Sequence, residues 1–78
     1  MKDLERITFN PRIMGGRACI RGMRITVSLI LNLVANGMSA NEIQGDYPYL
    51  EEEDIRQALK YAAFLADESV HPLEPAPA

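Results

Sequence analysis

The chain has 78 residues, of which 47% are hydrophobic and 24% are charged, and its formal net charge is −3. This length suits one small domain and excludes two, and a domain this small needs a metal, disulfides or a partner subunit to reach ordinary stability. One cysteine, Cys19, and one histidine, His71, exclude an intrachain disulfide and disfavour a four-ligand zinc site, so we expect a homo-oligomer.

The first third of the chain predicts a small β element. Residues 6–9 alternate polar and apolar side chains and stop at an Asn-Pro turn signal, which favours a short strand. A sharp bend is predicted at Gly15-Gly16. Residues 17–20 and 23–26 then flank Arg21-Gly22 as the two arms of a small hairpin.

Residues 27–36 predict a helix that is apolar on nearly every side. Thr26 is placed to cap its start, and Gly37 is a residue type that ends helices. A helix without a polar face must be buried on all sides. This stretch contains the longest apolar run of the chain, which is far shorter than the ~20 residues that span a bilayer. Because the first residues also lack the pattern of a signal peptide, we expect a cytoplasmic protein without a membrane anchor.

Two further helices are predicted in the second half. Ser39-Ala40-Asn41-Glu42 fits a capping box at the start of a short helix, which we expect Gly45 to end. From Glu51 to about Glu68 the spacing predicts one long helix, whose acidic first turn suits the positive end of the helix dipole. Its apolar face is predicted to hold Ile55, Ala58, Leu59, Ala62, Leu65 and Ala66.

The order of these elements predicts the fold class. An apolar helix, a short capped helix, a turn and a longer helix have the order and lengths of a helix-turn-helix. We therefore expect a mainly α, helix-turn-helix-like three-helix bundle with a small N-terminal β element, that is an α+β fold, over residues 1–68. Residues 69–78 contain three prolines and no periodicity, and are predicted to form a disordered proline-rich tail.

No enzyme constellation is predicted, and neither a cofactor nor a metal is expected. The acids from Glu51 to Asp54 suggest a Mg²⁺ site less readily than an ordinary helix start. Gly15-Gly16-Arg17 lacks the Lys-Ser/Thr of a phosphate-binding loop. Strand alternation would place Cys19 beside Arg17 and Arg21, where a thiolate is favoured, but a lone cysteine is more commonly a small buried residue.

Charge is distributed unevenly along the chain. Residues 1–36 carry six basic and two acidic side chains, whereas residues 37–78 carry two basic and nine acidic ones. The basic part can meet nucleic-acid phosphates, and the acidic start of the long helix would repel them, so we predict that the hairpin arginines bind nucleic acid. The alternative is that they pair with the acidic half of the same chain or of its neighbour. The predicted nucleic-acid-binding residues are Arg12, Arg17, Arg21 and Arg24.

Two surfaces are predicted to bind protein. The apolar helix and the aromatic residues of the long helix exceed what one small bundle can cover, which predicts a homodimer through Leu29, Leu33, Tyr61 and Phe64. In the tail, Val70, Leu73 and Glu74 are candidate anchors for a second protein. The alternatives are an inert, solvated tail and a partner surface at the acidic start of the long helix.

The string from Gly15 to Val27, Gly-Gly-Arg-Ala-Cys-Ile-Arg-Gly-Met-Arg-Ile-Thr-Val, resembles the signature of the prokaryotic family called domain of unknown function 433. The resemblance continues through Asp46-Tyr47-Pro48 and Asp54-Ile55-Arg56 and covers about residues 5–66. Ala18 and Met23 depart from the usual Pro and Thr. The resemblance implies a helix-turn-helix-like homodimer that is similar to VapB-type antitoxins, because members often lie beside genes for PIN-type nuclease toxins.

We therefore expect the antitoxin of a type II toxin-antitoxin pair, with a PIN-type nuclease toxin as partner and operator DNA as a possible second ligand for autoregulation. The alternative is a homodimeric interaction module without DNA binding. An enzyme that uses Cys19 as its nucleophile is the least favoured hypothesis.

Overall fold

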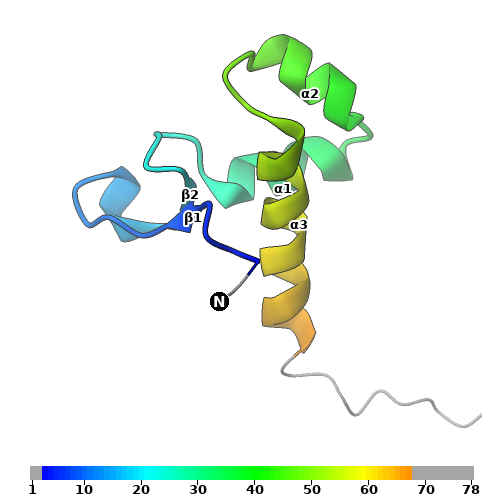
Figure 1. The fold of residues 1–78 in the computed structure, drawn as a ribbon. Coiled ribbons are helices and arrows are strands. Elements are labelled where there is room, and N and C mark those ends of the chain that lie inside the picture. The colour runs from blue at the N-terminus through cyan, green and yellow to red at the C-terminus, as the bar shows by residue number, and fades with distance from the viewer. Residues whose placement is uncertain (1–2, 68–78) are drawn as a thin grey trace, which may run out of the picture.

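Three helices and a two-stranded antiparallel sheet make up the computed structural model, which describes residues 3–67 (Figure 1). In chain order the elements are β1 (Ile7–Thr8), the 3-10 turn η1 (Met14–Gly16), β2 (Cys19–Ile20), α1 (Val27–Ala35), α2 (Ala40–Asp46) and α3 (Glu52–Asp67). This arrangement confirms the predicted mainly α, α+β fold. The predicted tail, residues 69–78, lies outside the described residues.

The structure contains the predicted hairpin, whose turn at Arg21-Gly22 is closed by a hydrogen bond from the Met23 N–H to the Ile20 carbonyl at 2.8 Å, and adds a pairing that the sequence did not predict. β2 pairs with β1, with Ile7 opposite Ile20 and Thr8 opposite Cys19. The expected second arm of the hairpin is present as well: the Ile20 N–H donates to the Ile25 carbonyl at 3.0 Å, the Val27 N–H donates to the Ala18 carbonyl at 2.9 Å, and Cys19 forms a bridge with Thr26. β2 therefore pairs both with β1 and with residues 25–27, and the Arg21 N–H donates to the carbonyl of Arg6, just before β1, at 2.8 Å.

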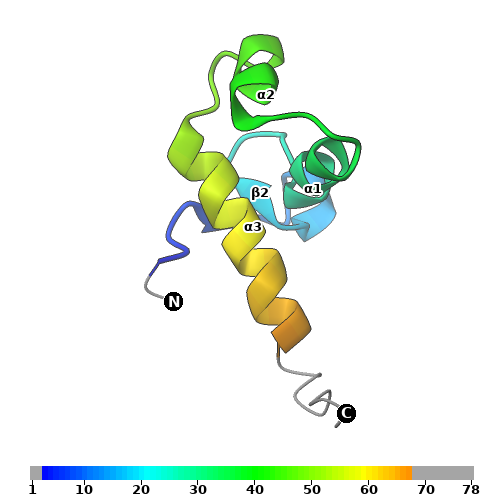
Figure 2. The same ribbon diagram turned by 90° about the vertical axis from the view of Figure 1, so that its right-hand side faces the viewer.

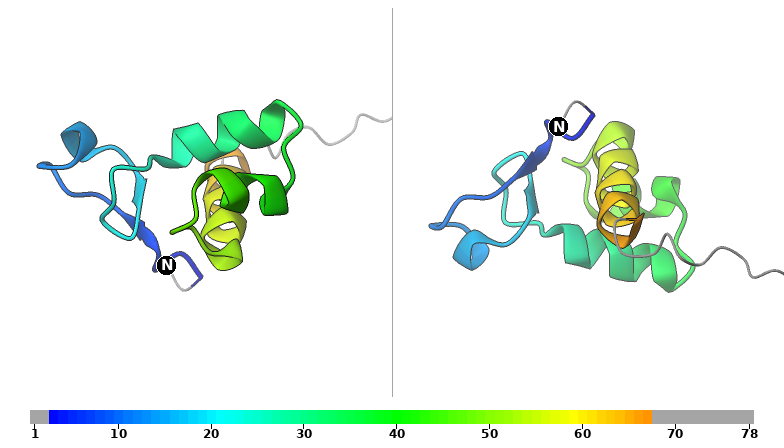
Figure 3. Two further views of the ribbon diagram at one scale, coloured as in Figure 1. Left: turned by 90° about the horizontal axis from the view of Figure 1, so that it is seen from above. Right: turned by 90° about the horizontal axis from the view of Figure 1, so that it is seen from below.

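The segment between the two strands, residues 9–18, projects away from the helices, as the views from above and below show (Figure 3). It turns at η1, where Met14, Gly15 and Gly16 all have positive φ angles of 51°, 67° and 85°. Arg12 and Arg17 are exposed on this projection. The projection thus carries the exposed side chain of Arg12, whereas Arg17, near its end, lies beside the start of α1.

Local capping signals define the starts of α1 and α2. The Thr26 hydroxyl accepts a hydrogen bond from the Leu29 N–H at 3.0 Å. Ser39 and Glu42 form the predicted capping box, with reciprocal bonds of 2.8 and 3.1 Å. The prediction that Gly45 ends α2 is wrong, because that helix runs through it to Asp46.

The core lies where α1 and α2 pack against α3 and the sheet (Figure 2). Ile20, Ile30, Ile43 and Ala58 are fully buried there. The prediction that the apolar helix is buried on all sides fails within one chain: only Val27 and Ile30 of α1 are buried, and its other large apolar side chains are half-buried. No helix within residues 3–67 is long and apolar enough to cross a membrane.

Candidate functional site

A buried carboxylate at the start of α3 holds the β element and the helices together. The side chain of Asp54 is completely buried. Its Oδ1 accepts hydrogen bonds from Arg6 Nη1 and Arg21 Nε, both at 2.9 Å, and its Oδ2 accepts from Arg21 Nη2 at 2.7 Å. Oδ2 also accepts from the backbone N–H of Glu51 at 2.8 Å, so that the same carboxylate caps the first turn of α3.

Neighbouring groups complete this cluster. Arg6 Nη1 donates to Glu51 Oε1 at 2.7 Å, and Arg21 Nη2 donates to the Tyr49 carbonyl at 3.0 Å. The buried side chain of Gln57 accepts from the Arg6 N–H at 2.9 Å and donates to Glu53 at 2.9 Å. Among residues 3–67, every buried side-chain nitrogen and oxygen has a hydrogen-bond partner. The positive charges of Arg6 and Arg21 are thus balanced by the carboxylates of Asp54 and Glu51, so this ion-pair cluster has no net charge that would attract a ligand.

The partners of Asp54 determine its ionisation. Burial alone would raise its pKa, but hydrogen bonds from Arg21, from the Glu51 backbone and from Arg6 outweigh this effect and lower the pKa from 3.8 to about 2. Glu53 behaves similarly, because hydrogen bonds from Arg56 and Gln57 lower its pKa from 4.5 to about 2. Both groups therefore favour the folded state in their charged forms.

The structure separates the four arginines that were predicted to bind nucleic acid. Arg21 points at Asp54 and is held there by three hydrogen bonds from its guanidinium, counting the one to Tyr49. Arg12, Arg17 and Arg24 are exposed, and within the described part of the chain their side chains form no ion pair. The alternative prediction, that these arginines pair with the acidic half of the chain, thus holds for Arg21. The side chains of Arg12, Arg17 and Arg24 are exposed.

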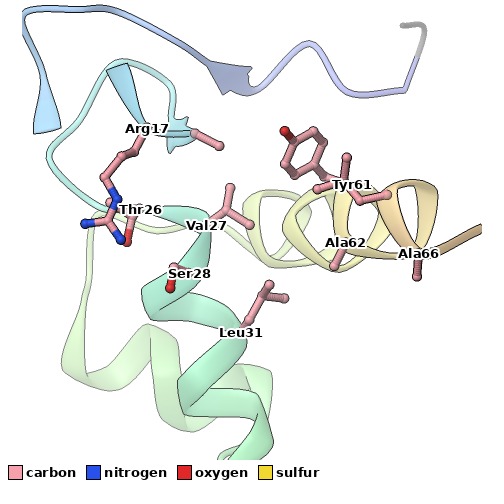
Figure 4. Close-up of a pocket in the computed structure, with 10 residues that line it drawn as sticks. Arg17, Thr26, Val27, Ser28, Leu31, Tyr61, Ala62 and Ala66 are labelled. Carbon is pink, nitrogen blue, oxygen red and sulfur yellow. The ribbon is translucent and has the colours of Figure 1, made fainter. Parts of the chain in front are cut away.

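An apolar groove of about 490 Å³ lies between α1 and the C-terminal half of α3 (Figure 4). Tyr61 forms one wall, and its ring meets that of Phe9 edge-on with centroids 6.0 Å apart. Arg17 lies at the other end of the lining (Figure 4). The two helices contribute most of the lining, with Val27, Ser28 and Leu31 from α1 and Ala62, Leu65 and Ala66 from α3.

The residues predicted for the dimer interface are not brought together. Of the four, only Tyr61 lines the groove. Leu29 and Leu33 are half-buried and pack against the core of their own chain. Phe64 is 50% exposed and lines a separate depression with Lys60, Ala63 and Asp67.

Other predicted site residues have different outcomes. Cys19 is buried in β2 with 2% of its surface exposed, which agrees with the interpretation as a small buried residue. Within residues 3–67 no group of three or more His, Cys, Asp or Glu side chains could hold a metal ion. The predicted partner-binding residues Val70, Leu73 and Glu74 lie outside the described residues.

Sequence reasoning missed Asp54 and Gln57 as the centre of the domain. Asp54 was interpreted as part of an ordinary helix start, and Gln57 was not singled out. The available signal was the uneven charge distribution, which allowed basic and acidic halves of one chain to pair. It could not single out which carboxylate is buried, because Asp54 is 48 residues from Arg6 and 33 from Arg21.

Comparison with known proteins gives one family. The family model described as protein of unknown function (DUF433) matches residues 7–62, a span that includes Arg21, Asp54 and most of the groove. The uncharacterized protein y4eO of Sinorhizobium fredii is 38% identical over 58 residues, which is 74% of this chain and 26% of that protein. The chain thus spans about a quarter of the length of this curated relative. No solved structure matches the chain.

Replacing the buried carboxylate tests its structural role. Asp54→Asn leaves two arginines facing a neutral amide, and we expect the free energy of unfolding to fall by about 3 kcal/mol. Glu52→Gln, in the same helical turn but exposed, is the matched control and should change it by less than about 0.5 kcal/mol. Urea unfolding of the two variants measures this difference, and equal effects would contradict the central role of Asp54.

The pKa of Asp54 also predicts how stability depends on pH. Its folded-state pKa of about 2 lies below its ordinary value of 3.8, so its contribution is complete above about pH 5 and is lost as the pH falls toward 2. This loss amounts to about 2 kcal/mol for Asp54.

The stability advantage of the wild type over Asp54→Asn should therefore shrink between pH 5 and pH 2, by roughly the amount that Asp54 contributes. Unfolding curves of both proteins across this range provide the measurement. Asp54→Asn should retain part of the acid sensitivity, because Glu53 titrates in the same window. A pH-independent difference between the two proteins would show that Asp54 gains nothing from its ionised form.

Proposed function

This chain belongs to the family described as protein of unknown function (DUF433), and we propose that it is a homodimeric, non-catalytic protein-binding domain that serves as the antitoxin of a PIN-type nuclease toxin. The observation that carries this proposal is the apolar groove between α1 and α3. Its lining is dominated by aliphatic and aromatic side chains, and Leu65 in it is 49% exposed. Apolar surface of this kind is typical of a site that binds another protein chain.

The antitoxin role rests on the family resemblance and on the charge of the chain. A nuclease holds RNA phosphates with basic residues, and the acidic half of this chain offers carboxylates that complement them. Of the carboxylates at the start of α3, we propose Glu52 for this contact. Asp54 is buried, Glu51 pairs with Arg6 and Glu53 pairs with Arg56, so Glu52 is the acid of that turn that faces solvent without such a partner among residues 3–67.

Neutralisation of the toxin is the direct test. We expect a nuclease encoded beside this chain's gene to arrest growth when expressed alone, and co-expression of the full chain to restore growth. A chain ending at Glu68 separates the two candidate inhibitory surfaces, because it keeps α3 and removes Val70, Leu73 and Glu74. RNA cleavage by the purified nuclease, measured with each version of the chain, gives the extent of inhibition.

Loss of inhibition in the shortened chain assigns inhibition to the tail, and full inhibition assigns it to the start of α3. Unaltered cleavage in the presence of the full chain would reject the antitoxin role. The homodimeric module without a nuclease partner would then be the better interpretation.

Autoregulation by DNA binding is the second part of the proposal, and the exposed Arg12, Arg17 and Arg24 support it. Six such side chains in a dimer predict that affinity for the operator falls roughly a thousandfold between 50 and 200 mM salt. Replacing all three by alanine should flatten this dependence. Arg56→Ala, which removes a basic residue that pairs with Glu53, is the matched control and should leave the dependence unchanged.

Binding of labelled upstream DNA, titrated at several salt concentrations, provides the measurement. Arg21→Ala should lower stability instead, because that side chain serves Asp54. A salt dependence unchanged in the triple variant would reject these arginines as the DNA contacts.

A further inference from the structure

Another depression lies between the turn of the hairpin and the connection from α2 to α3, and we call it the Tyr49 depression. Met23, Arg24 and Ile25 line it from the turn, and Tyr49 lines it from the connection. Its volume is about 420 Å³, which lies within the ~300–1,000 Å³ of small-ligand sites. It shares no lining residue with the groove between α1 and α3 and is therefore a separate feature of the surface.

Hydrogen bonds fix the backbone on both sides of this depression. Arg21 Nη2 donates to the carbonyl of Tyr49 at 3.0 Å, and the same guanidinium is held by Asp54. The Gly22 N–H donates to Thr8 Oγ1 at 2.8 Å, which attaches the hairpin turn to β1. The carbonyl of Tyr49 is thus used inside the protein, whereas its ring is 57% exposed.

The exposed groups of the depression suit a flat ring that carries an anion. Met23 and Ile25 contribute apolar surface beside the Tyr49 ring. Arg24 is exposed and, within residues 3–67, forms no ion pair. Glu51, the acidic residue nearest to Tyr49 in the chain, pairs with Arg6 instead. An aromatic face beside an unpaired guanidinium is the combination with which proteins bind a nucleobase and its phosphate.

The charge of the surrounding chain favours a polyanion over a ligand with one negative charge. Residues 7–41 contain four arginines and no acidic side chain. Arg21 serves Asp54, and the other three, Arg12, Arg17 and Arg24, are exposed. A peptide carboxylate would need only one of them, whereas successive phosphates of a nucleic acid can use several.

We infer that the Tyr49 depression binds single-stranded nucleic acid, with one unpaired base stacked on the Tyr49 ring and an adjacent phosphate at Arg24. A base inside a duplex is stacked on its neighbours and offers no free face, so the ring selects a single strand. This inference goes beyond the proposed function. It shares with the proposed operator contact only Arg24, and it depends on neither the toxin nor the dimer.

Removal of the ring tests the stacking contact. We expect Tyr49→Ala to weaken binding of a fluorescent oligothymidylate, about 12 nucleotides long, about tenfold, and Tyr49→Phe to bind like the wild type. Phe64→Ala is the matched control, because Phe64 is 50% exposed but lies outside the depression, and it should leave the affinity unchanged. Fluorescence anisotropy measures the dissociation constants.

An abasic oligonucleotide of the same length and charge separates base stacking from phosphate contacts. The wild type should bind it about tenfold more weakly than the thymidylate, whereas Tyr49→Ala should bind both equally, because the ring and the base act on each other. Arg24→Ala should weaken binding of both oligonucleotides and reduce the slope of log affinity against log salt by about 0.7, the value for one phosphate of a single strand. Circular dichroism checks that the variants remain folded, which we expect because the Tyr49 ring is exposed and alanine keeps the carbonyl that binds Arg21.

The outcomes separate this inference from the proposed function. An affinity unchanged in Tyr49→Ala, equal binding of abasic and normal strands by the wild type, or no binding of the single strand at low salt would each overturn the inference. None of these results concerns neutralisation of the nuclease or binding of duplex operator DNA. Conversely, a failure to bind the duplex would reject autoregulation, and the predicted single-strand results would still support the Tyr49 site.

Discussion

The buried carboxylate of Asp54 is the interaction on which the arrangement of this domain depends. It is fully buried, and it receives hydrogen bonds from Arg6, which precedes β1, from Arg21, which follows β2, and from the first turn of α3. A charge taken out of water is tolerated only when its partners are complete, so loss of any one partner exposes the cost of burial. The β element is consequently attached to the helices by electrostatics as well as by packing.

The same interaction determines which basic side chains remain available for function. Arg21 adopts a positive φ of 46°, which is uncommon for a residue with a side chain, and its contacts with Asp54 and with the Arg6 carbonyl stabilise it there. Glycine would adopt this backbone more easily but could not reach the carboxylate. The five arginines before α1 therefore divide into an inner pair, Arg6 and Arg21, and three exposed ones, Arg12, Arg17 and Arg24.

Local signals in the sequence predicted the helices well. The features that the sequence did not predict depend on contacts between distant segments. Thr26 and the Ser39–Glu42 capping box act within one helical turn, so a short stretch of sequence was enough to predict both helix starts. The burial of Asp54 and the pairing of β2 with β1 depend on residues far apart in the chain. Periodicity placed Ala62, Leu65 and Ala66 on the core side of α3, but it carries no information on where the covering helices end. Where the covering helices end, the apolar side chains of α3 stop being part of the core and line the groove instead.

Stability and assembly are coupled in a domain of this size. Without an intrachain disulfide, the single core formed by α1, α2, α3 and the sheet must supply the folding free energy, and the described chain leaves the end of its longest apolar stripe uncovered. In the proposed homodimer, association adds to this folding free energy. Mass action then makes the apparent stability rise with protein concentration, since the dimer binds only folded chains. A second protein that binds only the folded chain, at Glu52 or elsewhere, would raise the stability in the same way.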